Sequence, residues 1–364
     1  IMKKKRIGFI GAGRVTKHHI DLLKKLSAYF KIEAVCDLIE SKCDEIIKLN
    51  KDTKIKKYRD YHEMIRECSL DLIAILTPSG MHYEHAIDII KNHNVDLILE
   101  KPPALKINSL KHIYNLSKKK KLNIFPVFQN RYNKAVKFLK KSIIQGKLGK
   151  INLCSVRVRW CRPQRYYDMS KWRGTFSHDG GALTNQGIHH IDLLRFLNGE
   201  IKSVRAVMRT LGSKIEVEDT VVANINFKNG SVGSLEITTA ARPDDFEASI
   251  SILGSKGMAQ IGGKAVNNLE IFTPDQKMCK KQSEKFPIVY GYGHLELYKK
   301  ILKFYKNKDL EVIKKDDCIK TLELLNSFYV SSELNKEIFL GNYLQSKNLG
   351  KKNEKISKLY RLKK

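Results

Sequence analysis

A short apolar segment runs directly into a glycine turn near the start of the chain, and this junction limits the fold more than any other feature. Residues Lys5 to Ile10 are typical of a buried strand, and Gly11-Ala12-Gly13 follows them at once. From Ile20 to Leu26 the apolar residues recur at helical spacing. The first glycine permits a tight turn, and the second lets backbone approach a pyrophosphate at the helix N-terminus. Thr16 replaces the third glycine of the pattern, so we expect helix and strand to lie slightly farther apart.

A second apolar strand, Ile32 to Cys36, ends at Asp37. A carboxylate in this position accepts hydrogen bonds from an adenosine ribose and repels a 2′-phosphate. We therefore expect NAD as the cofactor in preference to NADP.

The chain then alternates between helical and strand patterns. This alternation predicts a parallel, doubly wound sheet. The expected helices are 61–68, 81–91 and 109–118, and the expected strands are 70–76, 95–99 and 124–127.

After a helix expected at 132–145, the apolar residues alternate in period two and Asn229-Gly230 forms a strong hairpin signal. The predicted fold class is α/β, with a Rossmann doubly wound parallel sheet plus an α+β domain built on a large open, mostly antiparallel sheet. The expected later strands are 152–162, 204–210, 220–227, 231–239, 248–253 and 258–261, and the closing helices are 294–305 and 319–335. The expected domains are 1–128 with the dinucleotide fingerprint, 129–345, and a basic C-terminal tail at 346–364. A family resemblance, carried by motifs given below, implies that 1–128 binds NAD and that 129–345 serves substrate binding and oligomerisation.

Composition excludes several classes of protein. A hydrophobic content of 42% is too high for a disordered chain, and no apolar run reaches the ~20 residues of a membrane helix. The seven cysteines are scattered without a C-x-x-C pair, which favours reduced thiols over disulfides or a zinc site. Because no secretory signal precedes the first strand, we expect a cytoplasmic protein. Because the cysteines form no zinc pattern, we expect no metal.

The formal net charge of +30 makes a nucleic-acid binder a hypothesis to weigh. Lysines are spread through every expected helix, however, and no nucleic-acid module is present, so we expect no such partner. The positive field suits acidic small molecules better. The basic end, Lys347 to Lys364, is expected to be solvated and partly helical.

The segment DLILEKPPA, Asp96 to Ala104, reads as a buried strand that stops at a lysine. Pro102 removes an N–H group and favours an extended Lys101 at the carboxyl edge of the sheet, where ligands bind in such folds. A surface lysine that ends a strand is the plainer alternative. The turn Thr77-Pro78-Ser79-Gly80-Met81-His82 follows another strand, and its polar groups can face the dinucleotide or simply cap a helix.

The densest polar stretch is GGALTNQGIHHIDLL, from Gly180 to Leu194. Asn185 and His189 are four residues apart, so we expect them on one helix face. His190 and Asp192 fall on other faces, where a hydrogen-bonded core residue is the plainer interpretation.

These motifs, in this order and spacing, resemble the Gfo/Idh/MocA family of oxidoreductases over roughly residues 5 to 340. Members bind NAD or NADP and act on sugar or cyclitol hydroxyls, so the resemblance implies an NAD-dependent dehydrogenase. It makes Lys101 the lysine near the reacting hydroxyl and His189 the catalytic histidine. Asn185 stands where many members carry Asp, and a neutral amide does not stabilise an imidazolium. Whether Lys101 or His189 is the base therefore stays open.

Four further segments resemble the UDP-N-acetyl-2-amino-2-deoxyglucuronate 3-dehydrogenase branch: FQNRYN, RWCRPQRYY, KWRGTF and YGYGHLELY. The resemblance implies oxidation of UDP-N-acetylglucosaminuronic acid at C-3, for bacterial surface polysaccharide such as lipopolysaccharide O-antigen, by a homo-oligomer, tetramer or dimer. A diphosphate and a carboxylate require guanidinium donors, which Arg131, Arg162 and Arg173 could supply. The alternatives are a cyclitol or free-sugar dehydrogenase of the same family, and a non-catalytic NAD-binding sensor.

Together the motifs and the resemblance give three sets of candidate residues. The catalytic set is Lys101, His189 and Asn185. The cofactor set is Gly11, Ala12, Gly13, Arg14, Val15, Asp37, Thr77, Pro78, His82, Glu100, Lys101, Gln129, Trp172 and Arg173. The substrate set is Lys101, Arg131, Arg162, Tyr166, Asn185, His189 and His294.

Overall fold

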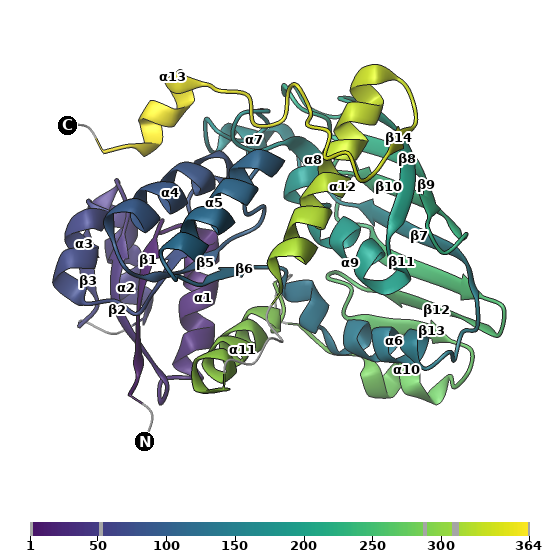
Figure 1. Ribbon diagram of the computed structural model, residues 1–364, viewed down its shortest axis with the longest axis horizontal. Helices are drawn as coiled ribbons and strands as arrows, with labels where there is room; N and C mark the ends of the chain where they lie inside the picture. Colours follow the sequence, from purple (N-terminus) through teal and green to yellow (C-terminus); the bar gives the residue numbers. More distant parts are fainter. Residues whose placement is uncertain (1–2, 51–53, 287–289, 308–312, 363–364) are drawn as a thin grey trace. The chain divides into compact units, whose positions relative to one another are not determined.

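The computed structural model describes residues 3–50, 54–286, 290–307 and 313–362, and the chain forms two compact units (Figure 1). Unit 1 comprises 1–127, 294–318 and 352–364, and unit 2 comprises 128–293 and 319–351. The division at 127/128 lies beside the boundary expected at 128. Two later segments differ from the expected division, because 294–318 and 352–364 group with the first unit.

Unit 1 is built on a parallel sheet in the order β3-β2-β1-β4-β5-β6, which confirms the doubly wound Rossmann arrangement. The strand order reverses beside β1, so the carboxyl ends of β1 and β4 flank the position where such folds bind ligands. The strands are β1 (Lys5–Ile10), β2 (Phe30–Cys36), β3 (Lys56–Tyr58), β4 (Leu72–Ile75), β5 (Asp96–Leu99) and β6 (Ile124–Pro126).

Helices connect and cover these strands. The helix expected at 61–68 is found with those bounds, and its N-terminus is capped by Asp60, whose side chain accepts from the His62 N–H. The helices of unit 1 are α1 (Arg14–Lys24), α2 (Glu40–Asn50), α3 (Tyr61–Cys68), η1 (Ser79–Met81), α4 (His82–Asn92), α5 (Ile107–Lys119), α11 (Gly293–Asn307), α13 (Glu354–Ser357) and η3 (Lys358–Tyr360).

Two contacts explain why late segments belong to unit 1. Tyr298 of α11 is fully buried, with its hydroxyl 2.7 Å from His19 Nδ1 and its ring centroid 5.4 Å from that of Phe30. Arg361 forms an ion pair with Glu84 of α4. The basic end is therefore partly docked, and its last residues, 363–364, lie outside the described residues.

Unit 2 carries a mostly antiparallel sheet in the order β13-β12-β11-β7-β10-β9-β8-β14, as expected. The pair β7·β10 is parallel, and the tight Asn229-Gly230 turn joins β9 to β10. The strands are β7 (Ile151–Arg159), β8 (Ile201–Arg209), β9 (Thr220–Phe227), β10 (Val232–Thr238), β11 (Glu247–Gly254), β12 (Gly257–Gly262), β13 (Asn268–Phe272) and β14 (Ile338–Phe339).

One face of this sheet is buried and the other is exposed. Along β9, Val221, Ala223 and Ile225 are buried while Val222 and Asn224 are exposed, which is the period-two pattern of a half-covered sheet. Helices α6, α8 and α9 contact the buried side. The expected homo-oligomer stays a prediction.

The helices of unit 2 are η2 (Gln129–Tyr132), α6 (Lys134–Ile144), α7 (Gln164–Asp168), α8 (Gly181–Asn185), α9 (Ile188–Asn198) and α10 (Lys277–Gln282), together with most of α12 (Lys315–Leu334).

Helix α9 is held in the core of unit 2 by a buried ion pair. Arg131 of η2 donates from Nε and Nη2 to the two carboxylate oxygens of Asp192, both at 2.6 Å. The Thr321 hydroxyl adds a 2.7 Å hydrogen bond to the same carboxylate, and Asp192 is 1% exposed. The plainer interpretation of Asp192, a bonded core residue, therefore agrees with the structure.

None of the described helices combines the length and the apolar composition that a membrane span requires.

Loss of this carboxylate charge tests how much the ion pair matters. Asp192→Asn leaves a buried guanidinium without a charged partner, so we expect it to lower the free energy of unfolding of unit 2 by about 3–5 kcal/mol. Glu216→Gln, which breaks an exposed pair with Lys351 in the same unit, should change it by less than about 1 kcal/mol. Both tryptophans, Trp160 and Trp172, lie in unit 2, so urea unfolding followed by tryptophan fluorescence reports on that unit. Equal stability of the two variants would contradict the assignment.

Candidate active site

The glycine turn leaves backbone of unit 1 open to a ligand. Gly11 has φ +97°, and a Cβ there would lie 2.7 Å from Leu76 O, so only glycine fits. A Cβ on Gly13 would meet no described atom within 4 Å, so this position has free space beside it. No side chain caps the N-terminus of α1, which begins at Arg14. An uncapped helix N-terminus beside open backbone suits a pyrophosphate. Thr16 bonds through Oγ1 to Gly11 O at 2.6 Å, which ties the helix to the turn.

Asp37 links the end of β2 to the same turn. Its Oδ2 accepts from the Ala12 N–H at 2.8 Å and its Oδ1 accepts from the Ile39 N–H at 2.9 Å. A carboxylate has about four acceptor positions, so these two bonds orient it and leave capacity for ribose hydroxyls. Contact of Asp37 with an adenosine ribose stays a prediction.

The turn after β4 is tied to the segment after β5. His82 is 1% exposed, and its two ring nitrogens lie 2.8 Å from Thr77 O and Pro102 O. Burial lowers the pKa of His82. Both nitrogens face protein backbone, so the structure gives His82 a positioning role in place of the cofactor contact expected. Pro78 precedes η1, and the Thr77 hydroxyl lies 2.9 Å from His85 Nδ1.

Glu100 and Lys101 end β5 within a buried network (here called the Glu100 network, made of His19, Glu100, His294 and Tyr298). Glu100 Oε1 lies 3.2 Å from His19 Nε2 and 3.1 Å from His294 Nε2, and Oε2 accepts from the Lys101 N–H at 3.0 Å. Burial alone would raise the pKa of Glu100, but the hydrogen bonds from the two histidines outweigh it and hold that pKa well below its usual range. Burial lowers the pKa of His19 to about 4. An anionic Glu100 bridged by two histidines therefore fixes the backbone that carries Lys101.

Three members of this network, His19, Glu100 and His294, have possible metal-ligand atoms within 4.8 Å of one another. Among the described residues, they form the one group of His, Cys, Asp or Glu side chains that could hold a metal ion. The separations of 3.1 and 3.2 Å are those of hydrogen bonds, and the second nitrogen of His19 is bonded to Tyr298. We interpret the group as a hydrogen-bond network. His294, expected at the substrate, belongs instead to this network in unit 1.

In unit 2 the structure brings Gln129 and His189 together, with Nε2 atoms 3.2 Å apart. The expectation that Asn185 and His189 share one helix face is wrong. Helix α8 ends at Asn185 and α9 begins at Ile188. The break lies at Gly187, where a Cβ would be 2.8 Å from Leu183 O and so could not be accommodated.

Asn185 is oriented by a carboxylate that sequence reasoning missed. The Asn185 amide donates from Nδ2 to Asp179, whose other oxygen accepts from the Gly174 N–H at 2.7 Å. Asp179 is 1% exposed. Since a carboxylate only accepts, the NH₂ group of Asn185 has to face Asp179. The available signal in the sequence is the position of Asp179 directly before Gly180-Gly181.

An aromatic and cationic cluster lies in the same unit. The guanidinium of Arg173 lies 4.4 Å from the Tyr166 ring centroid and 4.7 Å from that of Trp172, and Nη1 donates to the Tyr166 hydroxyl at 2.5 Å. Gln186 donates to the same hydroxyl at 3.3 Å. Burial raises the pKa of Tyr166, and the Arg173 charge opposes this. Arg173 Nε is buried and has no hydrogen-bond partner among the described protein atoms. This N–H is a donor in need of an acceptor.

The other two expected arginines are already paired inside unit 2. Arg131 is taken up by Asp192, so the structure makes it a positioning residue of α9 in place of a substrate contact. Arg162 donates to Asp245 at 2.9 Å and to Cys161 O at 2.6 Å. It also lies 5.6 Å from the Tyr166 ring centroid.

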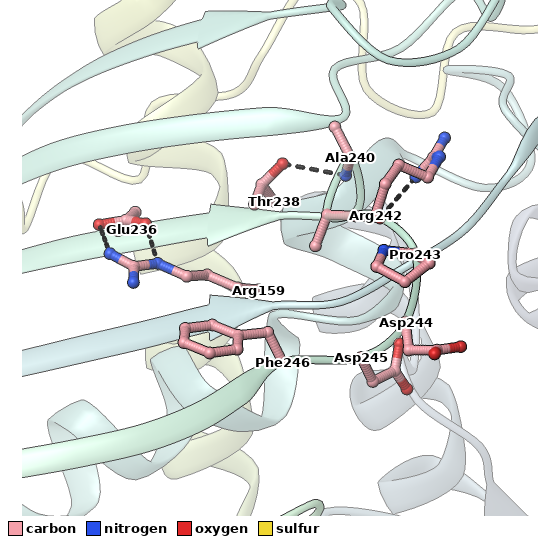
Figure 2. A pocket seen from close by; sticks show the side chains of 10 residues that line it. Arg159, Glu236, Thr238, Ala240, Arg242, Pro243, Asp244, Asp245 and Phe246 are labelled. Carbon is pink, nitrogen blue, oxygen red and sulfur yellow. Dashed lines mark hydrogen bonds and ion pairs between the residues drawn. The ribbon is translucent and has the colours of Figure 1, made fainter.

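A separate open groove lies beside the ends of β7, β10 and β11 (Figure 2). Its charged side chains are largely satisfied by the protein, since Arg159 pairs with Glu236 and Arg242 bonds backbone carbonyls. None of the candidate residues from the sequence lines it. We therefore do not place the active site there.

Comparisons with known proteins agree with both units. The family model described as an oxidoreductase family with an NAD-binding Rossmann fold matches residues 5–128, and the GFO/IDH/MocA C-terminal domain matches 136–260. The myo-inositol 2-dehydrogenase of Thermotoga maritima is 27% identical over 261 residues, which are 69% of this chain and 73% of that protein.

Two solved structures are similar over nearly the whole chain. The WlbA dehydrogenase of Chromobacterium violaceum is 30% identical with a TM-score of 0.86, covering 94% of this chain and 97% of its own. The WlbA dehydrogenase of Bordetella pertussis is 31% identical with a TM-score of 0.86, covering 93% and 98%. Both structures are complexes with NADH and UDP-GlcNAcA.

The position of Asp37 predicts cofactor preference. The unmodified protein should bind NAD more tightly than NADP, and Asp37→Ser should narrow that difference by removing repulsion of the 2′-phosphate. Cofactor titrations followed by NADH and NADPH fluorescence measure both affinities. Asp21→Ser, on the exposed side of α1, is the control for loss of one negative charge. Equal affinity of the unmodified protein for the two cofactors would mean that Asp37 does not face the ribose.

Proposed function

The chain belongs to the Gfo/Idh/MocA family of NAD-dependent oxidoreductases, which act on alcohol groups, and we propose that it oxidises the C-3 hydroxyl of UDP-N-acetylglucosaminuronic acid (UDP-GlcNAcA). One observation carries the substrate: two dehydrogenases at 30% and 31% identity, similar over more than nine tenths of this chain, are complexes with NADH and UDP-GlcNAcA. The 3-keto product would supply an aminotransferase on the route to bacterial surface polysaccharide.

The roles proposed for this chain's residues follow from their surroundings. When bound, NAD accepts the hydride from the carbinol carbon. Lys101 orients the reacting hydroxyl and takes part in removing its proton, because the Glu100 network fixes its backbone at the carboxyl end of β5. For His189 and Asn185 we propose contacts to the sugar. Either Lys101 or His189 accepts the proton.

Arg173 supports an anionic substrate. Its guanidinium lies 4.4 and 4.7 Å from the ring centroids of Tyr166 and Trp172, and its Nε–H is buried without an acceptor among the described protein atoms. A buried donor on a cation is costly until an acceptor binds, and a carboxylate or phosphate oxygen is the strongest acceptor available to it. We therefore propose that Arg173 pairs with an acidic group of the substrate.

A cyclitol or free-sugar dehydrogenase is the second candidate function. The similarity to myo-inositol 2-dehydrogenase, and to the scyllo-inositol 2-dehydrogenase of Bacillus subtilis at 24% identity, favours it. Such substrates have no acidic group, so they would offer Arg173 Nε only a neutral hydroxyl oxygen, which is a weaker acceptor than a carboxylate or phosphate. A non-catalytic NAD sensor is the remaining alternative, and it predicts no turnover with any sugar.

Replacement of Lys101 tests its part in the reaction. Lys101→Met should lower turnover by about a hundredfold or more while NAD still binds, because proton transfer and orientation are lost and the glycine turn is intact. Lys91→Met, on an exposed position of α4, removes the same charge and should leave turnover near the wild-type value. Steady-state turnover and NADH binding are measured side by side. Turnover of Lys101→Met near that of the unmodified protein would remove Lys101 from the mechanism.

Substrate preference tests the function itself. UDP-GlcNAcA should be oxidised far better than UDP-N-acetylglucosamine, because the neutral sugar leaves a guanidinium unpaired at a penalty of roughly 1–3 kcal/mol or more. Arg173→Gln should narrow this difference, whereas Arg157→Gln on the partly exposed strand β7 should not.

The assay has to draw the reaction forward, since oxidation of a secondary alcohol by NAD is uphill at neutral pH. It should couple the 3-keto product to an aminotransferase, or supply 2-oxoglutarate in case the enzyme recycles its NADH. Turnover of inositol or a free hexose, with neither NADH nor 3-keto product from UDP-GlcNAcA, would favour the second candidate function.

A further inference from the structure

The carboxyl group of Glu218 is buried beside the helix that carries Asn185. Glu218 lies between β8 and β9, is 4% exposed, and holds the first turn of α8 in two ways. Its backbone carbonyl accepts from the Ala182 N–H at 3.0 Å, and its Oε1 accepts from the Leu183 N–H at 2.9 Å. A Cβ on Gly181 would lie 2.2 Å from Glu218 Oε2, so the glycine makes room for this carboxyl group. Glu218 therefore fixes the backbone two residues before Asn185.

The hydroxyl of Tyr329 on α12 contacts the Glu218 carboxyl group. This hydroxyl has one proton, so it can donate only one full hydrogen bond. This oxygen is 2.8 Å from Glu218 Oε1, 2.8 Å from Thr184 Oγ1, and bonded to Gly180 O. The Gly180 carbonyl can only accept, so the Tyr329 proton is used there. The contact between Tyr329 and Glu218 then needs a proton of its own. A protonated Glu218 carboxyl supplies it, whereas a carboxylate would face the phenol oxygen without one.

The surroundings also disfavour a charge on Glu218. The titratable groups that face it are the Tyr329 phenol and the Asp179 carboxyl, and no cation among the described residues pairs with it. Its Oε2 atom is buried without a hydrogen-bond partner among the described protein atoms. Burial, with the nearby Asp179 carboxyl adding to it, raises the pKa of Glu218 to about 8.

We propose that Glu218 is a neutral, proton-linked positioning residue, which holds α8 and therefore Asn185 in place for the reaction proposed above. This role rests on the proposed function for its catalytic consequence, but its protonation state does not. Loss of the proton places a second negative charge beside Asp179 and breaks the bond to Tyr329. The Leu183 N–H keeps its acceptor, but the carboxylate moves away from the Tyr329 oxygen and shifts the first turn of α8 with it, so the site loses its alignment.

The sign of the pH dependence follows from proton binding. Between the ordinary pKa of 4.5 and about 8, the folded protein keeps the Glu218 proton that the unfolded chain has released. The folded state binds more protons than the unfolded chain in this window. The contribution of Glu218 to the free energy of unfolding therefore falls as the pH rises from 4.5 to about 8. Above about pH 8 the folded protein has also lost the Glu218 proton, and the full cost of a buried charge on Glu218 lowers the free energy of unfolding.

Glu218→Gln tests this linkage, because an amide is neutral at every pH. Between about pH 6 and about pH 8.5, the unfolding midpoint of the wild-type protein should fall by roughly 5 °C more than that of Glu218→Gln. Glu45→Gln, on an exposed position of α2, removes the same charge and should follow the wild-type curve. Parallel curves for Glu218→Gln and the wild type would overturn the proposal.

Turnover gives the second readout. Above about pH 8.5 the ratio of Glu218→Gln turnover to wild-type turnover should rise about threefold or more over its value near neutrality, with NADH affinity alike in both proteins. A constant ratio would overturn the positioning role. If no UDP-sugar is turned over, the proposed function fails, while the unfolding curves still decide the protonation of Glu218.

Infrared difference spectra cover the case in which Glu218→Gln does not fold. The wild-type protein at about pH 7 should show the carbonyl band of a protonated carboxyl group, which disappears as the pH passes about 8. Absence of that band near neutrality would overturn the proposal without any variant.

Discussion

A single buried carboxylate, that of Glu100, connects the parts of unit 1 on which its chemistry depends. It receives His19 from the helix after the glycine turn, His294 from α11 and the backbone N–H of Lys101. Each bond favours the charged form of Glu100, and together they overcome the cost of burying it. The lysine that follows is therefore carried by backbone that two separate segments, α1 and α11, hold in place.

Unit 2 uses its buried carboxyl groups in different ways. Asp192 is stabilised by a two-pronged bond to Arg131, and the pair fixes the helix that begins beside His189. Glu218 has no such cation among the described residues, and we propose that it stays neutral and holds α8 by hydrogen bonds. Pairing the charge with a cation and removing it by protonation are two ways to bury a carboxyl group without a large penalty.

Local patterns in the sequence predicted the main elements well. Helix α3 and strand β9 have the bounds expected from their periodicity, because a repeated apolar spacing selects one conformation and one buried face. The short strands β3 and β14 were not expected, since two or three residues carry no period and exist as strands only through their partners. The break between α8 and α9 was also missed, and only the tertiary structure shows that Ile237 and Leu183 leave no room for a Cβ at Gly187 within that break.

The sequence by itself determined the Rossmann arrangement, the family, the NAD cofactor and the place of Lys101 at the end of β5, because each rests on residues that are neighbours along the chain. Only the tertiary structure decided which polar groups are already used. Arg131 meets Asp192 across 61 positions, and His294 meets Glu100 across 194. A spacing pattern records which residues a chain has, but a hydrogen bond uses up a donor and an acceptor that the fold alone brings together. For that reason only the fold shows that Arg131, His82 and His294 are bonded within the protein, and that Asp179 and Glu218 are bonded to the helix that carries Asn185.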